Sequence, residues 1–302
     1  MRVVSLLPSA TEMVAALGAL DQLVGVTHAC DYPPQVASRP RLTSTHVSAM
    51  AAPATIDREV RAAVERGAPL YDVNEPLLAS LRPDVIVTQA LCDVCAVRET
   101  DVRAIAQRIA PSPTIVTLSG TSIDGIIADI ERVASALGMA DEAEELVPGM
   151  RARLRSVHER LRTARAPRSR VAVLEWTAPL FAGGHWVPEM VHRAGGVDAL
   201  ATPGQHSRMV TRDDVAAAAP DVILFAPCGY ELERAAREAS TLLASDAWTW
   251  ARGRAVWALN ANSLTSRPGP RVIDGVETIA AVLHPSLFGF PASDRALRLT
   301  TA

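Results

Sequence analysis

Three observations predict an α/β protein built from two lobes. First, one pattern occurs twice, at residues 81–92 and 218–228: a helix-like run ends at a Pro-Asp corner, a short apolar run follows, and then a loop with a cysteine. Second, such short apolar runs bounded by breakers are typical of strands buried on both faces of a parallel sheet. Third, strand-like and helix-like segments alternate along the chain, which favours parallel sheets covered by helices.

The two copies of this pattern predict a ligand cleft between the lobes. In open α/β sheets, ligands bind beyond the carboxyl ends of the strands, and both cysteine-bearing loops follow a strand. We therefore expect the loops of both lobes to line one cleft. The predicted domains are an N-terminal α/β lobe over residues 1–138, a bridging helix over residues 139–166 and a C-terminal α/β lobe over residues 167–302.

Composition excludes several classes of protein. The chain has 302 residues, of which 49% are hydrophobic and 21% charged, which indicates a soluble folded protein with a core in each lobe. A net charge of -3 gives no reason to expect nucleic acid. No run reaches the roughly 18 to 20 apolar residues of a membrane helix, so we expect no membrane insertion. Without a recognisable secretory signal, the protein is expected to be cytoplasmic as written, or periplasmic if a signal was removed.

The first lobe is predicted to open with a strand at residues 3–7 that Pro8 ends. Ser9 to Glu12 matches a capping box, with Ser9 as the N-cap of the first helix. The amides at this helix start would face a ligand beyond the first strand, which makes Ser9 and Thr11 candidate ligand-binding residues. The polar stretch that follows Pro34 and runs through His46 and Pro53 is expected to be irregular. The other predicted elements are strands at 23–27, 71–73, 85–87 and 114–118 and helices at 57–66, from 74, 98–109 and 122–137.

A long charged helix at residues 141–165, bent or broken near Pro148, is predicted to bridge the lobes, because its polarity suits a helix between domains. The second lobe then repeats the alternation of strand and helix. Its predicted elements are strands at 171–175, 222–225 and 255–259 and helices at 188–194, from 211, 231–243 and 269–283.

All four cysteines fall in predicted loops after strands: Cys30, Cys92, Cys95 and Cys228. Free cysteines that only pack would fall inside helices and strands. Thiolates that converge on one cleft suit zinc or an iron–sulfur cluster, so the four are candidate metal ligands. The residues 92–95 also form a CxxC, which leaves a redox dithiol open, and plain packing of unliganded thiols remains the competing interpretation.

Other candidate ligand-binding residues lie in the same class of loop. His28 and His185 carry nitrogens for a metal or for the cobalt or iron of a tetrapyrrole. Aromatic side chains offer flat apolar area for a corrin or porphyrin face, and asparagine or glutamine side chains offer hydrogen bonds to ligand amides. Local packing and turn formation are the alternative roles for all of these. The further candidates are Gln89, Trp176, Trp186, Tyr230, Asn260 and Asn262.

Motifs of common enzymes are missing. The sequence has no nucleophile elbow around Ser9, no paired-carboxylate motif and no phosphate loop. The glycines of a dinucleotide fingerprint are also missing. We therefore expect a binding protein more than an enzyme, and an enzyme only through the cysteine loops.

The chain resembles the class III periplasmic substrate-binding proteins of ABC importers, which bind vitamin B12, haem and iron-siderophore complexes, and is most similar to the cobalamin-binding branch. The resemblance rests on residues 2–12, 17–18, 23–26, 31–34 and 81–86 of the first lobe and 195–196 and 220–223 of the second. It implies two Rossmann-like lobes joined by one rigid helix, a ligand clamped between them and a membrane permease as partner.

Together these inferences predict a substrate-binding protein that holds a corrinoid, haem-like or other metal-containing ligand in the interlobe cleft. An ABC permease would be its partner if the protein is exported. The alternative is a cytoplasmic metal- or iron–sulfur-binding protein, or an enzyme, on the same fold, in which the cysteines of the cleft hold the metal.

Overall fold

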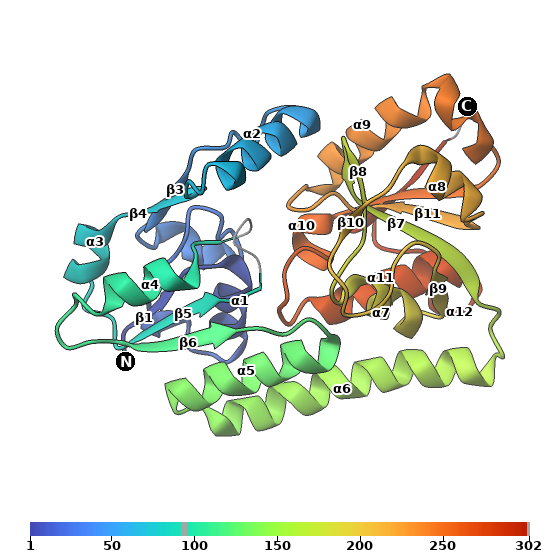
Figure 1. The fold of residues 1–302 in the computed structure, drawn as a ribbon. Helices are drawn as coiled ribbons and strands as arrows, with labels where there is room; N and C mark the ends of the chain where they lie inside the picture. The colour runs from blue at the N-terminus through green and yellow to red at the C-terminus, as the bar shows by residue number, and fades with distance from the viewer. Residues whose placement is uncertain (92–95, 301–302) are drawn as a thin grey trace. The chain divides into compact units, whose positions relative to one another are not determined.

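A computed structural model describes residues 1–91 and 96–300 and divides the chain into two compact units (Figure 1). Unit 1 contains residues 1–120 and 124–149, and unit 2 contains residues 121–123 and those from 150 onward. Each unit holds a sheet with parallel central strands, which confirms the predicted α/β class. The division into three parts at residues 138 and 166 stays a prediction, as does the cleft between the lobes.

The sheet of unit 1 has the order β2-β1-β5-β6 and is parallel throughout. A second, antiparallel pair is formed by β3 and β4. The prediction of an irregular polar stretch missed β3, whose β-branched threonines pair with β4 although they are polar. The strands are β1 Val3–Ser5, β2 Leu23–Gly25, β3 Thr43–Thr45, β4 Tyr71–Val73, β5 Val85–Gln89 and β6 Thr114–Leu118. The helices are α1 Pro8–Ala16, α2 Pro53–Glu65, α3 Glu75–Ser80, α4 Glu99–Ala106 and α5 Ile123–Leu137, with short 3-10 helices η1 Leu20–Gln22 and η2 Pro34–Ser38.

One face of this sheet is covered by α3 and α4. Val4 of β1 and Ile86 of β5 are buried with Leu78 of α3 and Val102 of α4 in one apolar cluster. The neighbouring positions on the two strands belong to the opposite face, because successive side chains alternate in a strand. Burial on both faces explains why these strands read as continuous apolar runs.

The start of α1 corrects the predicted capping box. The helix begins at Pro8, and Leu7 is the N-cap without a side-chain hydrogen bond. Proline at the first helical position supplies a suitable φ angle and lacks an N–H that would need a partner. Ser9 is therefore the second helical residue, buried inside unit 1.

Unit 2 has a larger, mixed sheet with the order β10-β8-β7-β11-β12-β13, and β9 also pairs with β7. The central strands β7, β11 and β12 are parallel, whereas β8, β10 and β13 join antiparallel at the edges. The strands are β7 Ser169–Thr177, β8 Leu180–Ala182, β9 Gly196–Asp198, β10 Arg208–Met209, β11 Val222–Phe225, β12 Ala255–Leu259 and β13 Ala296–Leu299. The helices are α7 Val187–Arg193, α8 Arg212–Ala217, α9 Leu232–Leu243, α10 Ala261–Leu264, α11 Val272–Leu283 and α12 Pro285–Phe288, with η3 Asp246–Ala251.

The repeated Pro-Asp corner has the same hydrogen bonds in both units. In unit 1 the Asp84 carboxylate accepts the backbone N–H of Arg2 at 2.6 Å, and the Arg2 side chain donates to the Leu81 carbonyl at 2.6 Å. In unit 2 the Asp221 carboxylate accepts the backbone N–H of Arg170 at 2.8 Å, and Arg170 donates to the Ala218 carbonyl at 2.7 Å. Each corner thus joins the end of one helix to the start of a neighbouring strand.

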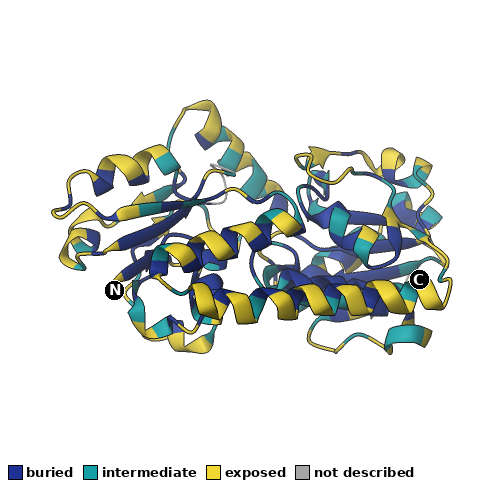
Figure 2. Ribbon diagram, turned by 90° about the horizontal axis from the view of Figure 1, so that it is seen from below, coloured by how far each residue is buried: buried dark blue, intermediate teal, exposed yellow. Residues whose placement is uncertain are grey.

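Helix α6, Ala140–Thr163, runs without interruption through Pro148, so the predicted break is absent. Figure 2 shows its exposed and buried residues in alternation. The buried positions recur every three or four residues, which forms one apolar stripe on a charged helix. They are Ala143, Val147, Met150, Leu154 and Val157. The sequence prediction, which rested on the polarity of this segment, did not include the stripe.

Arg153 attaches the second part of α6 to α11 within unit 2. Its guanidinium donates to Asp274 at 2.6 Å and to Glu277 at 2.5 Å. The hydrogen bonds that the guanidinium donates to these carboxylates raise the pKa of Arg153, and the bond to Glu277 contributes most. Across the part of the chain that the structure describes, no helix combines the length and the apolar character needed to cross a membrane.

Candidate ligand-binding site

Loops after the parallel strands of unit 2 are joined to one another at the carboxyl edge of its sheet. The Cys228 N–H donates to the Glu175 carbonyl at 2.9 Å, which connects the loop after β11 to the end of β7. The Asn262 N–H donates to the Tyr230 carbonyl at 3.0 Å, which connects the segment after β12 to the same loop. The structure therefore brings Trp176, Tyr230 and Asn262, all predicted site residues, to one edge of one sheet.

Trp176 and Tyr230 contact each other edge to face, with ring centroids 5.3 Å apart. Trp176 lies within β7, not in the loop where the sequence predicted it. Tyr230 is buried with Ala235 of α9 in a small apolar cluster, and the Arg234 guanidinium lies 3.8 Å above its ring. Burial raises the pKa of Tyr230 to about 12. This environment gives Tyr230 a packing role and leaves the partly exposed Trp176 as the aromatic that can meet a ligand.

His185 and Trp186 connect β8 to α7. Trp186 is buried, and its Nε1 donates to the Thr265 carbonyl at 2.9 Å, so it anchors the segment that follows α10. His185 has a left-handed backbone, φ 53°, and its ring lies 5.7 Å from Trp186 and 4.9 Å from His206. Burial first, and then the charge of His206, lower the pKa of His185.

Asn260 and Asn262 flank the start of α10. Asn260 is its N-cap and accepts the Ser263 N–H at 3.3 Å. The Asn262 side chain donates to Glu231 at 2.5 Å and accepts from Arg267 at 2.7 Å. Its orientation is therefore fixed by two charged neighbours.

Arg267 is a residue that the sequence reasoning missed. It is only 7% exposed, which is unusual for a guanidinium. The sequence offered one signal, an arginine in the breaker-rich run 266–270 after the predicted strand at 255–259. Its guanidinium donates to the Asn262 side chain at 2.7 Å, so this buried cation helps to hold Asn262 in place at this edge of unit 2.

In unit 1, a buried chain of hydroxyl groups ends at a thiol. Thr11 Oγ1 donates to Ser5 Oγ at 2.9 Å and lies 3.0 Å from Cys30 Sγ. The Thr27 hydroxyl is 3.2 Å from the same sulfur. Thr11 is fully buried, so it supports the loop after β2 from beneath. The Ser9 hydroxyl is also buried and has no hydrogen-bond partner among the described residues.

His28 lies on the exposed side of that loop. Its Nδ1 is 2.7 Å from the Thr43 hydroxyl, and its ring lies 5.8 Å from the Tyr71 ring at an angle of 30°. Partial burial of the ring and the charge of Arg41 lower the pKa of His28. Gln89, the last residue of β5, is buried at 7% exposure.

The predicted cysteine site is seen only in part. Cys30 is buried against two threonine hydroxyls, and Cys228 is exposed in unit 2. Cys92 and Cys95 lie outside the described residues. Within residues 1–91 and 96–300, no group of three histidine, cysteine, aspartate or glutamate side chains is placed to hold a metal ion. Metal binding by the four cysteines stays a prediction.

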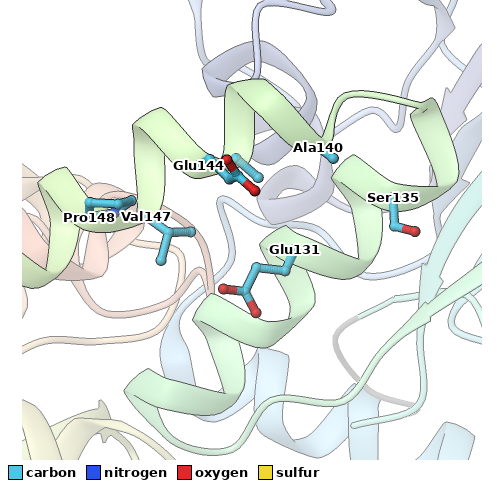
Figure 3. Close-up of a pocket in the computed structure, with 7 residues that line it drawn as sticks. Glu131, Ser135, Ala140, Glu144, Val147 and Pro148 are labelled. Carbon is cyan, nitrogen blue, oxygen red and sulfur yellow. The ribbon is translucent and has the colours of Figure 1, made fainter.

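A groove between α5 and α6 of unit 1 lies in the helical layer, not among the loops that follow strands (Figure 3). Glu131 and Ser135 line it from α5, and Glu144, Val147 and Pro148 line it from α6. Of the predicted site residues within 1–91 and 96–300, none borders this groove.

Burial divides the ten candidate ligand-binding residues into two sets. The buried set is Ser9, Thr11, Gln89, Trp186 and Tyr230. The accessible set is His28, Trp176, His185, Asn260 and Asn262. A direct ligand contact needs accessible surface, so in this structure the first set supports the loops and the second set can meet a ligand.

Comparison with known proteins gives the family. The sequence profile described as periplasmic binding protein matches residues 3–256, which spans both sheets apart from the edge strand β13 and the end of β12. The chain belongs to the periplasmic binding protein family. As a member of this family it is 25% identical to a vitamin B12-binding protein of Vibrio cholerae over 285 residues, which cover 93% of this chain and 88% of that protein.

One further relative and one solved structure match nearly the whole length of this periplasmic binding protein. An uncharacterized ABC transporter substrate-binding lipoprotein of Bacillus subtilis is 24% identical over 295 residues, 95% of this chain and 81% of that protein. The structure of a periplasmic heme-binding protein from Roseiflexus in apo form superposes with a TM-score of 0.70 at 21% identity, over 95% of this chain and 98% of that one. The last likeness confirms the fold.

Proposed function

We propose that this chain is the substrate-binding protein of an ABC importer and that it captures a cobalt corrinoid, a haem or a related metal complex. The observation that carries the proposal is the family match over residues 3–256, which covers most of both units. Relatives named for vitamin B12 and for heme support the ligand class. The lipoprotein relative supports an ABC permease as partner.

The mechanism is capture by loops that are already ordered. Hydrogen bonds hold the loop after β2 through Thr11 and Thr27, and charged neighbours hold Asn262. Pre-ordered loops lose little conformational entropy when a ligand binds, which favours affinity. The family description supports a periplasmic location for this function, and the comparisons give the cytoplasmic alternative no support.

Titration with cyanocobalamin, diaquacobinamide and ferric haem tests the proposal. We expect at least one to bind with 1:1 stoichiometry in calorimetry, to quench tryptophan fluorescence and to raise the unfolding temperature, because a ligand that binds only the folded state stabilises it. No binding by any of the three would overturn the ligand class.

A pair of variants tests the carboxyl edge of unit 2. Asn262→Ala removes a fixed amide there and should weaken binding about tenfold, or about 1.4 kcal/mol. Gln107→Ala is the control, because it removes an exposed amide at the end of α4. This helix leads back to the amino-terminal edge of the unit 1 sheet, so the substitution should leave affinity unchanged. Equal affinities of the two variants would show that Asn262 does not contact the ligand.

A further inference from the structure

We propose that His28 coordinates the metal of a planar tetrapyrrole ligand through Nε2, as an axial ligand that replaces a bound water. This inference rests on the proposed function and adds to it one residue, one atom and one bond. The supporting observation is that unit 1 holds the His28 imidazole in place at Nδ1 and leaves Nε2 accessible.

The backbone under His28 is held from several directions. The Ala29 N–H donates to Thr27 Oγ1 at 3.2 Å, and the Cys30 N–H donates to the Thr27 carbonyl at 3.3 Å. Arg41 donates to the carbonyls of Thr27 at 2.9 Å and Cys30 at 2.5 Å, on either side of the histidine. The turn therefore presents His28 from a fixed position directly after β2.

The imidazole itself is also held. Thr43 Oγ1 accepts the His28 backbone N–H at 3.1 Å and lies 2.7 Å from Nδ1, so one hydroxyl group fixes both the main chain and the ring. Tyr71, from the neighbouring strand β4, lies against the ring. Nε2 is on the far side of the imidazole from Nδ1, and within the described residues it has no hydrogen-bond partner.

An imidazole anchored at one nitrogen and open at the other is the arrangement of metal-binding histidines, whose second nitrogen usually donates to an acceptor that sets the tautomer and the ring orientation. In the tautomer with hydrogen on Nδ1, Thr43 accepts that hydrogen and Nε2 carries a lone pair directed away from Thr43. Coordination then exchanges a metal-bound water for Nε2. No electron is transferred, and the water leaves intact.

The other histidines lack this combination. His46 is paired through Nε2 with Asp72 at 2.9 Å, and His284 is buried at 6% exposure. His192 is 2.9 Å from Arg168 through Nδ1, a cationic neighbour that opposes metal binding. His185 and His206 lie against each other. His158 is exposed on α6, away from the loops that follow strands, and serves as the matched control.

Absorption spectra of bound diaquacobinamide and bound ferric haem test the proposal, because an axial imidazole in place of water changes the bands of both chromophores. Binding is measured separately by equilibrium dialysis. For at least one chromophore, the wild-type complex should show the imidazole-ligated spectrum. His28→Ala should lose it and keep the water-ligated spectrum while still binding, and added imidazole should restore it. His158→Ala should match the wild type, and Thr43→Val should lower affinity roughly tenfold.

The outcomes separate the two proposals. If either chromophore binds but the wild-type spectra remain those of the water-ligated forms, or if His28→Ala keeps the imidazole-ligated spectrum, the role of His28 is wrong and the proposed function stands. If dialysis detects binding of neither chromophore to the wild type, the inference is overturned together with the tetrapyrrole part of the proposed function.

Discussion

Asp198 ends β9 in a position where its charged form is unfavourable. Burial raises its pKa to about 6 from 3.8, although it accepts the N–H groups of Leu200 and Ala201, each at 2.9 Å. Because its pKa is higher in the folded state than in the unfolded chain, the folded protein holds the proton more tightly. The resulting stability is present at low pH and is lost as the pH rises from about 4 to 6.

Asp198→Asn removes this titration and can still accept both backbone N–H groups. At pH 8 we expect the free energy of unfolding of the variant, measured with urea, to exceed that of the wild type. The difference should be up to about 3 kcal/mol for a shift of about two pKa units. The difference should shrink as the pH falls toward 4. Unfolding curves whose separation is the same at pH 4 and pH 8 would contradict the assignment.

At this scale the sequence could place some candidates after their strands but could not show which of the candidates are buried. His28 follows β2 as predicted, and Asn260 follows β12 as predicted. Tyr230 also lies in a loop after a strand, yet it is buried in a cluster with Ala258 of β12, against which Trp176 of β7 packs. Burial of a loop residue depends on distant segments, which local patterns do not contain. Arg41, which clamps the turn of His28, went unnoticed for the same reason.

At the scale of elements, substitution of two glycines, one packed against a helix and one within a helix, should have opposite effects on stability. A Cβ on Gly120 would lie 2.5 Å from the backbone of Gly125 in α5, whereas a Cβ on Gly149, in the middle of α6, would meet nothing within 4 Å. Gly120→Ala should lower the free energy of unfolding by about 1–3 kcal/mol through overpacking. Gly149→Ala should raise it by about 0.5–1 kcal/mol, because alanine is the better helix former. Chemical denaturation measures both, and a neutral Gly120→Ala would show that α5 can move away.

The elements that the sequence predicted are those with strong local signals. The Pro-Asp corners predicted the strands β5 and β11, and both strands begin directly after these corners. The edge strands of unit 2, β10 and β13, were missed because their patterns are weak. In β13, for example, Leu297 is 47% exposed although it is apolar, so the strand does not alternate in the expected way. In α1 the proline after Leu7 outweighed the capping-box pattern.

At the scale of the whole molecule, Asp84 and Asp221 are equivalent probes of the two units. Each exposed carboxylate accepts one backbone N–H at the start of a central strand. We expect Asp84→Ala and Asp221→Ala each to cost about 1 kcal/mol. Each unit has its own sheet and core, so calorimetry should show two overlapping transitions, with each substitution lowering a different one. Identical effects on a single transition would mean that the units unfold together.

Recognition of the family from sequence succeeded at this scale because the motifs it rests on are distributed over both units, and the profile match over residues 3–256 confirms it. The ligand was not fixed by the same motifs. They encode strand starts, corners and turns, which related proteins share, whereas the ligand is chosen by the few side chains at the loop surfaces.

The position of β13 bears on how the protein is made. This strand, Ala296–Leu299, pairs with β12 along the outer side of the central strands of unit 2. During translation, the ribosome releases β12 before β13 has emerged, and an unpaired strand edge invites pairing with other chains. A nascent polypeptide would therefore carry an open edge on unit 2 until residues 296–299 leave the exit tunnel, and until then chaperones that shield extended segments could bind that edge.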